Sequence, residues 1–167
     1  MKEKIYRNYL EIKSLENFKE SKKPSPDYSV NLVNPKDFQL NKFFYKKIGK
    51  NCQWIDRLVW SDLNWMNYVA DKKLTTYVLK DNDQIAGYYE VIFNQITKEA
   101  EIAYFGILEE YFGRRLGGYL LSDAIKRLFL MKTARIWVHT CSLDHKNALN
   151  NYLSRGMKIF KSEVLIK

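Results

Sequence analysis

The sequence predicts a mixed α/β fold in which one sheet is flanked by helices. Extended and helical patterns follow one another in the order strand, helices, three strands, helix, strand, helix and strand. In addition, the stretch 101–157 contains a strand, a glycine-rich basic turn and an amphipathic helix in direct succession. The length of 167 residues allows one domain with a complete hydrophobic core.

The first half of the chain combines weakly patterned strands with two helices. Segment 22–27, rich in lysine and proline, indicates a surface linker rather than a domain boundary. Asn34 before Pro35 is typical of a helix start. The expected elements are an edge strand at 4–14, a linker at 18–28, a strand at 29–33, and helices at 34–50 and 61–71. Within the single domain, we expect residues 1–27 to supply a strand and a linker before a core at 28–167.

The second half has more regular patterns. Segment 81–83 separates two apolar runs and predicts a hairpin. Apolar residues from Leu116 to Leu128 recur at helical spacing, and Gly156 ends the last expected helix. The expected elements are hairpin strands at 75–79 and 85–92, strands at 101–107, 135–140 and 158–166, and helices beginning at 116 and 146.

A glycine-rich turn at 112–118 lies directly between an apolar strand and the amphipathic helix. It reads Phe112-Gly113-Arg114-Arg115-Leu116-Gly117-Gly118. Such a turn brings free backbone N–H groups to the positive end of a helix, which is an anion site well suited to phosphate. The sequence therefore predicts that the chain binds a phosphorylated cofactor.

Charge and composition narrow the functional classes. The net charge of +9 comes from scattered lysines and arginines without a nucleic-acid motif, which favours a solvated basic surface over a nucleic-acid partner. A basic adaptor for nucleic acid is the third and weakest functional hypothesis. No apolar run has the length of about 20 residues that a membrane span needs, and the N-terminus lacks the apolar core of a secretion signal. Two cysteines, Cys52 and Cys141, favour a reduced cytoplasmic setting.

The order and spacing of these motifs resemble the GNAT superfamily of N-acetyltransferases. The superfamily's pattern Gln/Arg-x-x-Gly-x-Gly/Ala falls on Phe112, Arg115 and Gly117, of which only the last agrees. A second pattern, Asn-x-x-Ala-x-x-x-Tyr-x-x-x-Gly-Phe, is matched from His145 to Met157. The likeness is greatest to bacterial members of unassigned substrate, with Tyr-Phe-Gly and Trp-Val-His-Thr-Cys on the fourth and fifth strands.

This resemblance implies a mostly antiparallel sheet that is splayed between the fourth and fifth strands of the family, and acetyl-CoA as the co-substrate. The cofactor residues that it implies are Ile107, Phe112, Gly113, Arg114, Arg115, Leu116, Gly117, Gly118 and His145. The backbone N–H near Ile107 would polarise the thioester carbonyl. If the Arg115 position needs a positive φ, a non-glycine residue there costs about 1–2 kcal/mol, which its guanidinium can offset by pairing with phosphate.

Two residues match the catalytic positions of the family. Glu101 corresponds to the general base that deprotonates the amine, with Glu90 as the second candidate; a solvent-exposed glutamate at a strand end is the structural alternative. Tyr152 corresponds to the general acid that protonates the coenzyme A thiolate, and a tyrosine packed on the sheet is the alternative. The implied reaction is direct N-acetyl transfer to a primary amine.

Other chemistry is less well supported. A zinc site through His139, Cys141 and His145 lacks a fourth ligand, and a Cys141 nucleophile has its partner two residues away on one strand, so we expect no metal and no covalent intermediate. We expect the acceptor pocket to come from the first helices, the loop with Trp54, Asp56 and Arg57, and strand 88–90. Small metabolites, peptide N-termini and lysine side chains are all open as acceptors. The sequence also allows a homodimer. The alternative function is a non-catalytic acyl-CoA-binding or sensing protein.

Overall fold

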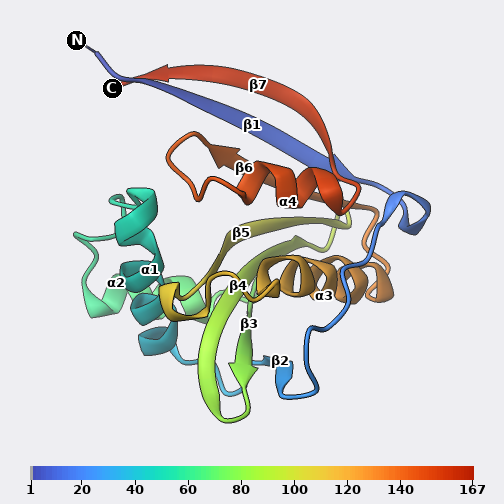
Figure 1. Cartoon of the computed structure of the whole chain (residues 1–167). Coiled ribbons are helices and arrows are strands. Elements are labelled where there is room, and N and C mark those ends of the chain that lie inside the picture. Colours follow the sequence, from blue (N-terminus) through green and yellow to red (C-terminus); the bar gives the residue numbers. More distant parts are fainter. Residues whose placement is uncertain (1) are drawn as a thin grey trace.

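The computed structural model describes residues 2–167 as one seven-stranded sheet with helices on both sides (Figure 1). The strands are β1 (Lys4–Ile12), β2 (Tyr28–Leu32), β3 (Leu74–Asp81), β4 (Gln84–Asn94), β5 (Glu99–Ile107), β6 (Arg135–Cys141) and β7 (Lys158–Ile166). The α-helices are α1 (Phe38–Cys52), α2 (Asp62–Ala70), α3 (Leu116–Leu130) and α4 (Ala148–Ser154). Two short 3-10 helices are η1 (Leu15–Asn17) and η2 (Glu109–Tyr111).

The predicted fold class is confirmed. The strand order is β2-β3-β4-β5-β6-β1-β7, and every neighbouring pair is antiparallel except β5 and β6. The parallel ladder of β5 and β6 runs only from Glu99 opposite Arg135 to Glu101 opposite Trp137. Because β5 continues to Ile107 without that partner, the sheet opens at this point. This is the splay that the resemblance implies.

The N-terminal strand is not an edge strand, which corrects the expectation from the sequence. β1 pairs with β6 on one side and with β7 on the other, so β7 forms the edge. Leu10 and Ile12 are buried in the core, which gives β1 a reason to lie inside the sheet. Figure 1 shows β1 and β7 as a long strand pair that arches beside α4, with the two chain ends close together.

Two helix boundaries also differ from the prediction. The first helix begins at Phe38 rather than at 34, because Asp37 caps it by accepting a hydrogen bond from the Gln39 N–H at 3.0 Å. The last helix begins at Ala148, two residues later than expected. The second helix follows the prediction, since Ser61 opens it with a capping box.

Helices cover the two faces of the sheet. On one face α1 packs against β4, where the rings of Phe44 and Tyr88 stack with centroids 4.6 Å apart. On the other face α3 buries Leu120, Leu121 and Ile125 completely.

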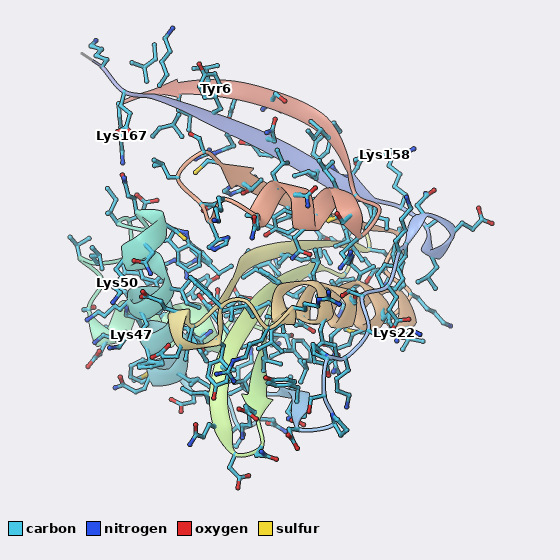
Figure 2. All side chains as sticks on the ribbon, viewed as in Figure 1. Tyr6, Lys22, Lys47, Lys50, Lys158 and Lys167 are labelled. Carbon is cyan, nitrogen blue, oxygen red and sulfur yellow. The ribbon has the colours of Figure 1, made fainter. Side chains whose placement is uncertain are left out.

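The basic surface is dispersed. Figure 2 shows Lys22, Lys158 and Lys167 on separate parts of the periphery, and Lys47 and Lys50 together at the α1 side. These lysines come from the linker, α1 and the two ends of the β7 segment, so they do not gather in one patch.

Candidate active site

A cavity of about 1040 Å³ occupies the opening between β5 and β6. Residues 102–107 of β5 line it, and so do residues of β6, α4, the start of α3 and the loop after α1. Along this part of β5 the edge that faces β6 has no strand partner. Its backbone N–H and C=O groups can therefore pair with an extended ligand in the cavity.

The turn at one end of the cavity has the geometry of an anion site. Gly113 has a φ of 79°, and Arg115 precedes the first residue of α3 with a φ of 60°. No side chain caps α3, so its first N–H groups remain available to a ligand. The structure thus forms the strand, turn and helix that the sequence predicts, and it places Arg115 in the strained left-handed region.

Most of the predicted cofactor residues come together around this cavity. Those that line it are Ile107, Phe112, Gly113, Arg115, Leu116, Gly117, Gly118 and His145. Arg114 does not line it, because its guanidinium lies over the Tyr111 ring at 4.8 Å and 4.0 Å from an oxygen of Asp81. The Arg114 side chain therefore points away from the expected phosphate position.

Two of these residues form a contact across the mouth of the cavity. The rings of Phe112 and His145 meet edge to face, with centroids 4.9 Å apart. Phe112 is 44% exposed and comes just before the turn, whereas His145 belongs to the loop before α4. The contact joins the two loops that flank the opening of the sheet.

Tyr152 lies on α4 and faces the cavity. Its side chain is buried, and its ring lies 6.2 Å from that of Phe105 on β5. Burial raises the pKa of Tyr152 well above its ordinary value, and the nearby Asp144 carboxylate raises it further. The phenol is therefore protonated at neutral and moderately alkaline pH, which is the form that donates a proton.

Asp144 organises the loop beside Tyr152, and the sequence did not single it out. Its carboxylate accepts hydrogen bonds from the Thr140 hydroxyl at 2.6 Å and from the Cys141 N–H at 2.9 Å. The indole N–H of Trp54 reaches the same carboxylate at 3.5 Å. An aspartate three residues after a strand end is a common loop-stabilising residue, but only the fold shows that it connects β6 to the loop after α1.

Glu101 is the candidate base that faces the cavity. The side chain is half-buried beside the β5–β6 opening. Burial raises the pKa of Glu101, and the positive charge of Arg57 opposes this rise. A carboxylate with a raised pKa in a cavity is suited to accept a proton from an amine.

Glu90, the second candidate base, has a different environment. It is completely buried and does not line the cavity. One carboxylate oxygen accepts a hydrogen bond from the Asn41 amide at 2.8 Å. The other oxygen accepts a hydrogen bond from the Tyr68 hydroxyl at 2.7 Å and lies 3.6 Å from Nη1 of Arg57. Glu90 therefore belongs to a buried polar network.

Tyr88 and Tyr89 are likewise buried away from the cavity, so the expected contribution of strand 88–90 to the acceptor pocket is wrong.

Arg57 lines the cavity and occupies the centre of an aromatic cage. Its guanidinium carbon lies 4.0 Å from the ring centroid of Tyr68 and 4.2 Å from that of Tyr104. Three more rings surround it at 4.6–5.7 Å, those of Trp60, Trp65 and Tyr45. Such contacts hold a planar cation firmly. Trp54, Asp56 and Arg57 all line the cavity, as the sequence predicts.

The residues considered for metal or covalent chemistry, His139, Cys141 and His145, line the cavity. Within residues 2–167, no three His, Cys, Asp or Glu side chains are arranged to hold a metal ion. Burial and the charge of Arg7 lower the pKa of His139, whose ring packs 5.6 Å from that of Tyr9.

None of the helices in the described part of the chain could cross a bilayer.

Comparisons with known proteins agree with this geometry. The model of the acetyltransferase (GNAT) family matches residues 39–157. Among solved structures, a GCN5-related N-acetyltransferase from Sphaerobacter thermophilus is similar with a TM-score of 0.73 and 14% identity, over 97% of this chain and 50% of that one. One from Kribbella flavida has a TM-score of 0.66 and 11% identity, over 96% and 56% of the two chains.

A third similar structure is more nearly the same length. The ribosomal-protein-S18-alanine N-acetyltransferase from Escherichia coli has a TM-score of 0.59 and 15% identity, over 83% of this chain and 93% of that one. By contrast, the chain spans only about half of the Sphaerobacter protein. No curated protein matches the sequence. The family match covers most of the chain and includes the glycine-rich turn at 112–118, Glu101 and Tyr152; the chain therefore belongs to the acetyltransferase (GNAT) family.

Proposed function

We propose that this acetyltransferase moves an acetyl group from acetyl-CoA to a primary amine by direct attack. One observation carries the proposal: a single cavity contains a carboxylate, a protonated phenol and the uncapped start of a helix. Glu101, Tyr152 and Gly117 represent these three features. An amine acceptor, a thiolate leaving group and a phosphorylated carrier need one of each.

The cavity residues fit acetyl-CoA. The N–H groups at the start of α3 and the guanidinium of Arg115 suit its phosphates. The unpaired edge of β5, from residue 102 to Ile107, offers backbone groups to the amide-containing pantetheine arm. When bound, acetyl-CoA would supply an acetyl group activated as a thioester. The backbone N–H near Ile107 is our candidate for polarising the thioester carbonyl.

Glu101 is our candidate for the residue that takes the proton from the acceptor. An amine arrives mainly as ammonium at neutral pH and must lose a proton before it can attack. Of the two candidate bases, Glu101 lines the cavity, whereas Glu90 is engaged in a buried network. Its carboxylate can act directly or through a water molecule.

Tyr152 is our candidate for the residue that returns a proton to the sulfur. Its phenol keeps its proton because burial and Asp144 raise its pKa. A thiolate is a stronger base than water at neutral pH, so a nearby O–H donor assists its departure.

The proposal is tested by a screen for thiol release from acetyl-CoA with amines of three classes. Small metabolites, peptides with a free N-terminus and peptides with an internal lysine are supplied in parallel, and products are identified by mass spectrometry. We expect one class to give an N-acetylated product well above the rate without protein. Binding of acetyl-CoA without any amine product would favour the alternative below.

A non-catalytic acyl-CoA-binding role is the second candidate. It is favoured by Phe112 and Arg115, which stand where the family's pattern has a polar residue and a glycine. Phe112 packs on His145 across the cavity mouth and Arg115 is strained, so both depart from a simple phosphate cradle.

The acceptor is proposed only as a small-molecule or peptide amine, because structures at this level of identity show the fold alone. We also propose a cytoplasmic location, which is supported by the two free cysteines, Cys52 and Cys141.

A further inference from the structure

Arg155 lies at the phosphate end of the cavity, although it comes from another helix. It forms the C-cap of α4 and lines the cavity. Its Nη1 lies 2.5 Å from the position that a Cβ atom on Gly118 would occupy. The guanidinium therefore rests against the first turn of α3, and glycine at 118 leaves the room that it needs.

This arginine has no partner of opposite charge among residues 2–167. Its Nε atom is buried and makes no hydrogen bond to any of them. Burial lowers the pKa of Arg155, and no neighbouring carboxylate offsets that effect. A partly buried cation without a partner is unfavourable, which indicates that an anion from outside the chain completes the site.

The N-terminal segment holds Arg155 in place. The N–H of Lys19 donates a hydrogen bond to the Arg155 carbonyl at 3.0 Å. Gly156 has a φ of 99°, and a side chain there would collide with the backbone of Asn17. The N–H of Ser21 in turn bonds to the Ser122 hydroxyl on α3 at 2.8 Å. These contacts hold the backbone at Arg155 in place before a ligand arrives, which lowers the entropic cost of binding.

We propose that Arg155 binds the pyrophosphate of acetyl-CoA together with the first N–H groups of α3. It would provide, from α4, the polar contact that the family's pattern has at the position of Phe112. A guanidinium matches the paired oxygens of a phosphate group, and the uncapped helix start fixes where the anion lies. The inference rests on the proposed function only in that acetyl-CoA is the ligand.

The test measures affinity by calorimetry for coenzyme A, 3′-dephospho-coenzyme A and pantetheine. We expect Arg155→Gln to weaken binding of the first two ligands by about 10–100-fold, the loss of one charge-assisted hydrogen bond. Binding of pantetheine, which lacks the pyrophosphate, should not change. Arg155→Lys should lose less affinity for coenzyme A and 3′-dephospho-coenzyme A than Arg155→Gln does, because it keeps the positive charge. Arg114→Gln is the matched control and should bind nearly as the wild type, because its side chain points away from the cavity.

The melting temperature without ligand separates binding from a structural role. Arg155→Gln should melt at or above the wild-type temperature, because it removes a partly buried cation that has no partner. Unchanged affinity for coenzyme A, or a loss confined to the ligand with the 3′-phosphate, would overturn the inference. A large fall in the melting temperature of Arg155→Gln that accounts for its weaker binding would also overturn the inference. If the wild type bound none of the three ligands, the proposed function itself would fail.

Discussion

At the scale of single residues, environment decides what each side chain can do. Glu90 and Glu101 are chemically identical, but Glu90 is tied to Asn41 and Tyr68 inside the protein, whereas Glu101 borders the cavity. Ala103 is the extra residue where the β4–β5 ladder shifts between Glu90 and Val91. A strand pattern read from the sequence cannot show such a shift, so it left both glutamates as candidates.

Glu101→Gln tests the general base. We expect kcat to fall by about 10²–10⁴-fold with little change in acetyl-CoA affinity. The pH profile carries a second signature. Because burial raises the pKa of Glu101, its carboxylate form appears only at a pH above that of an ordinary glutamate. The acid limb of kcat/KM should therefore lie above the ordinary glutamate value in the wild type and vanish in Glu101→Gln.

Tyr152→Phe tests the general acid. The change keeps the ring on Phe105 and removes only the hydroxyl, so the fold should survive. We expect kcat to fall by about 10²-fold or more, with coenzyme A affinity nearly unchanged. Rate and melting temperature are measured on the same preparation. Full activity in the variant would end the general-acid assignment.

Arg115 combines backbone strain with a favourable charge. Its φ of 60° costs a non-glycine residue about 1–2 kcal/mol, and glycine would avoid this cost. The greater flexibility of glycine in the unfolded chain would in turn cost about 0.5–1 kcal/mol. Arg115→Gly should therefore raise the free energy of unfolding by no more than about 1.5 kcal/mol. Both Arg115→Gly and Arg115→Ala should weaken coenzyme A binding by about 1–3 kcal/mol. Denaturant titration and calorimetry measure the two effects. Tighter binding by Arg115→Gly would show that the arginine obstructs the phosphates.

At the scale of elements, local patterns were predictable and pairing was not. The turn at 112–118 and helix α3 follow from glycines and apolar spacing over a few residues, and both form as expected. The position of β1 depends on partners more than 120 residues away in sequence, such as Cys141 opposite Arg7, so the alternation at 4–14 could not place it inside the sheet. For the same reason the sequence could not bring Arg155 or Asp144 to the cavity.

Leu10→Ala tests the interior position of β1. Leu10 is completely buried, and its backbone pairs with both β6 and β7. We expect the substitution to lower the free energy of unfolding by about 2–5 kcal/mol. Leu15→Ala is the matched control, since Leu15 is 52% exposed, and it should change stability by no more than about 0.5 kcal/mol. Equal effects of the two changes in denaturant titrations would argue that β1 is a loosely attached edge strand.

At the scale of the whole molecule, the opening between β5 and β6 joins the fold to the proposed chemistry. A continuous ladder would use the β5 backbone for sheet pairing, but here it ends at Glu101 and leaves a cavity of about 1040 Å³. The strand pair β1–β7 closes the sheet beyond β6, so the opening does not leave β6 as a free edge. The glycine-rich turn at 112–118, Tyr152 and Glu101 then meet around one space.

The most direct test of the central claim is to follow an isotope-labelled acetyl group from acetyl-CoA by mass spectrometry. The wild-type protein is incubated with the labelled acetyl-CoA and with the best amine from the screen of three classes, and Tyr152→Phe is the matched variant. We predict labelled amide in step with released thiol for the wild type, no label retained on the protein, and a much lower rate for the variant. Acetyl-CoA that binds in the cavity but never labels an amine, or label that accumulates on the protein, would contradict direct acetyl transfer.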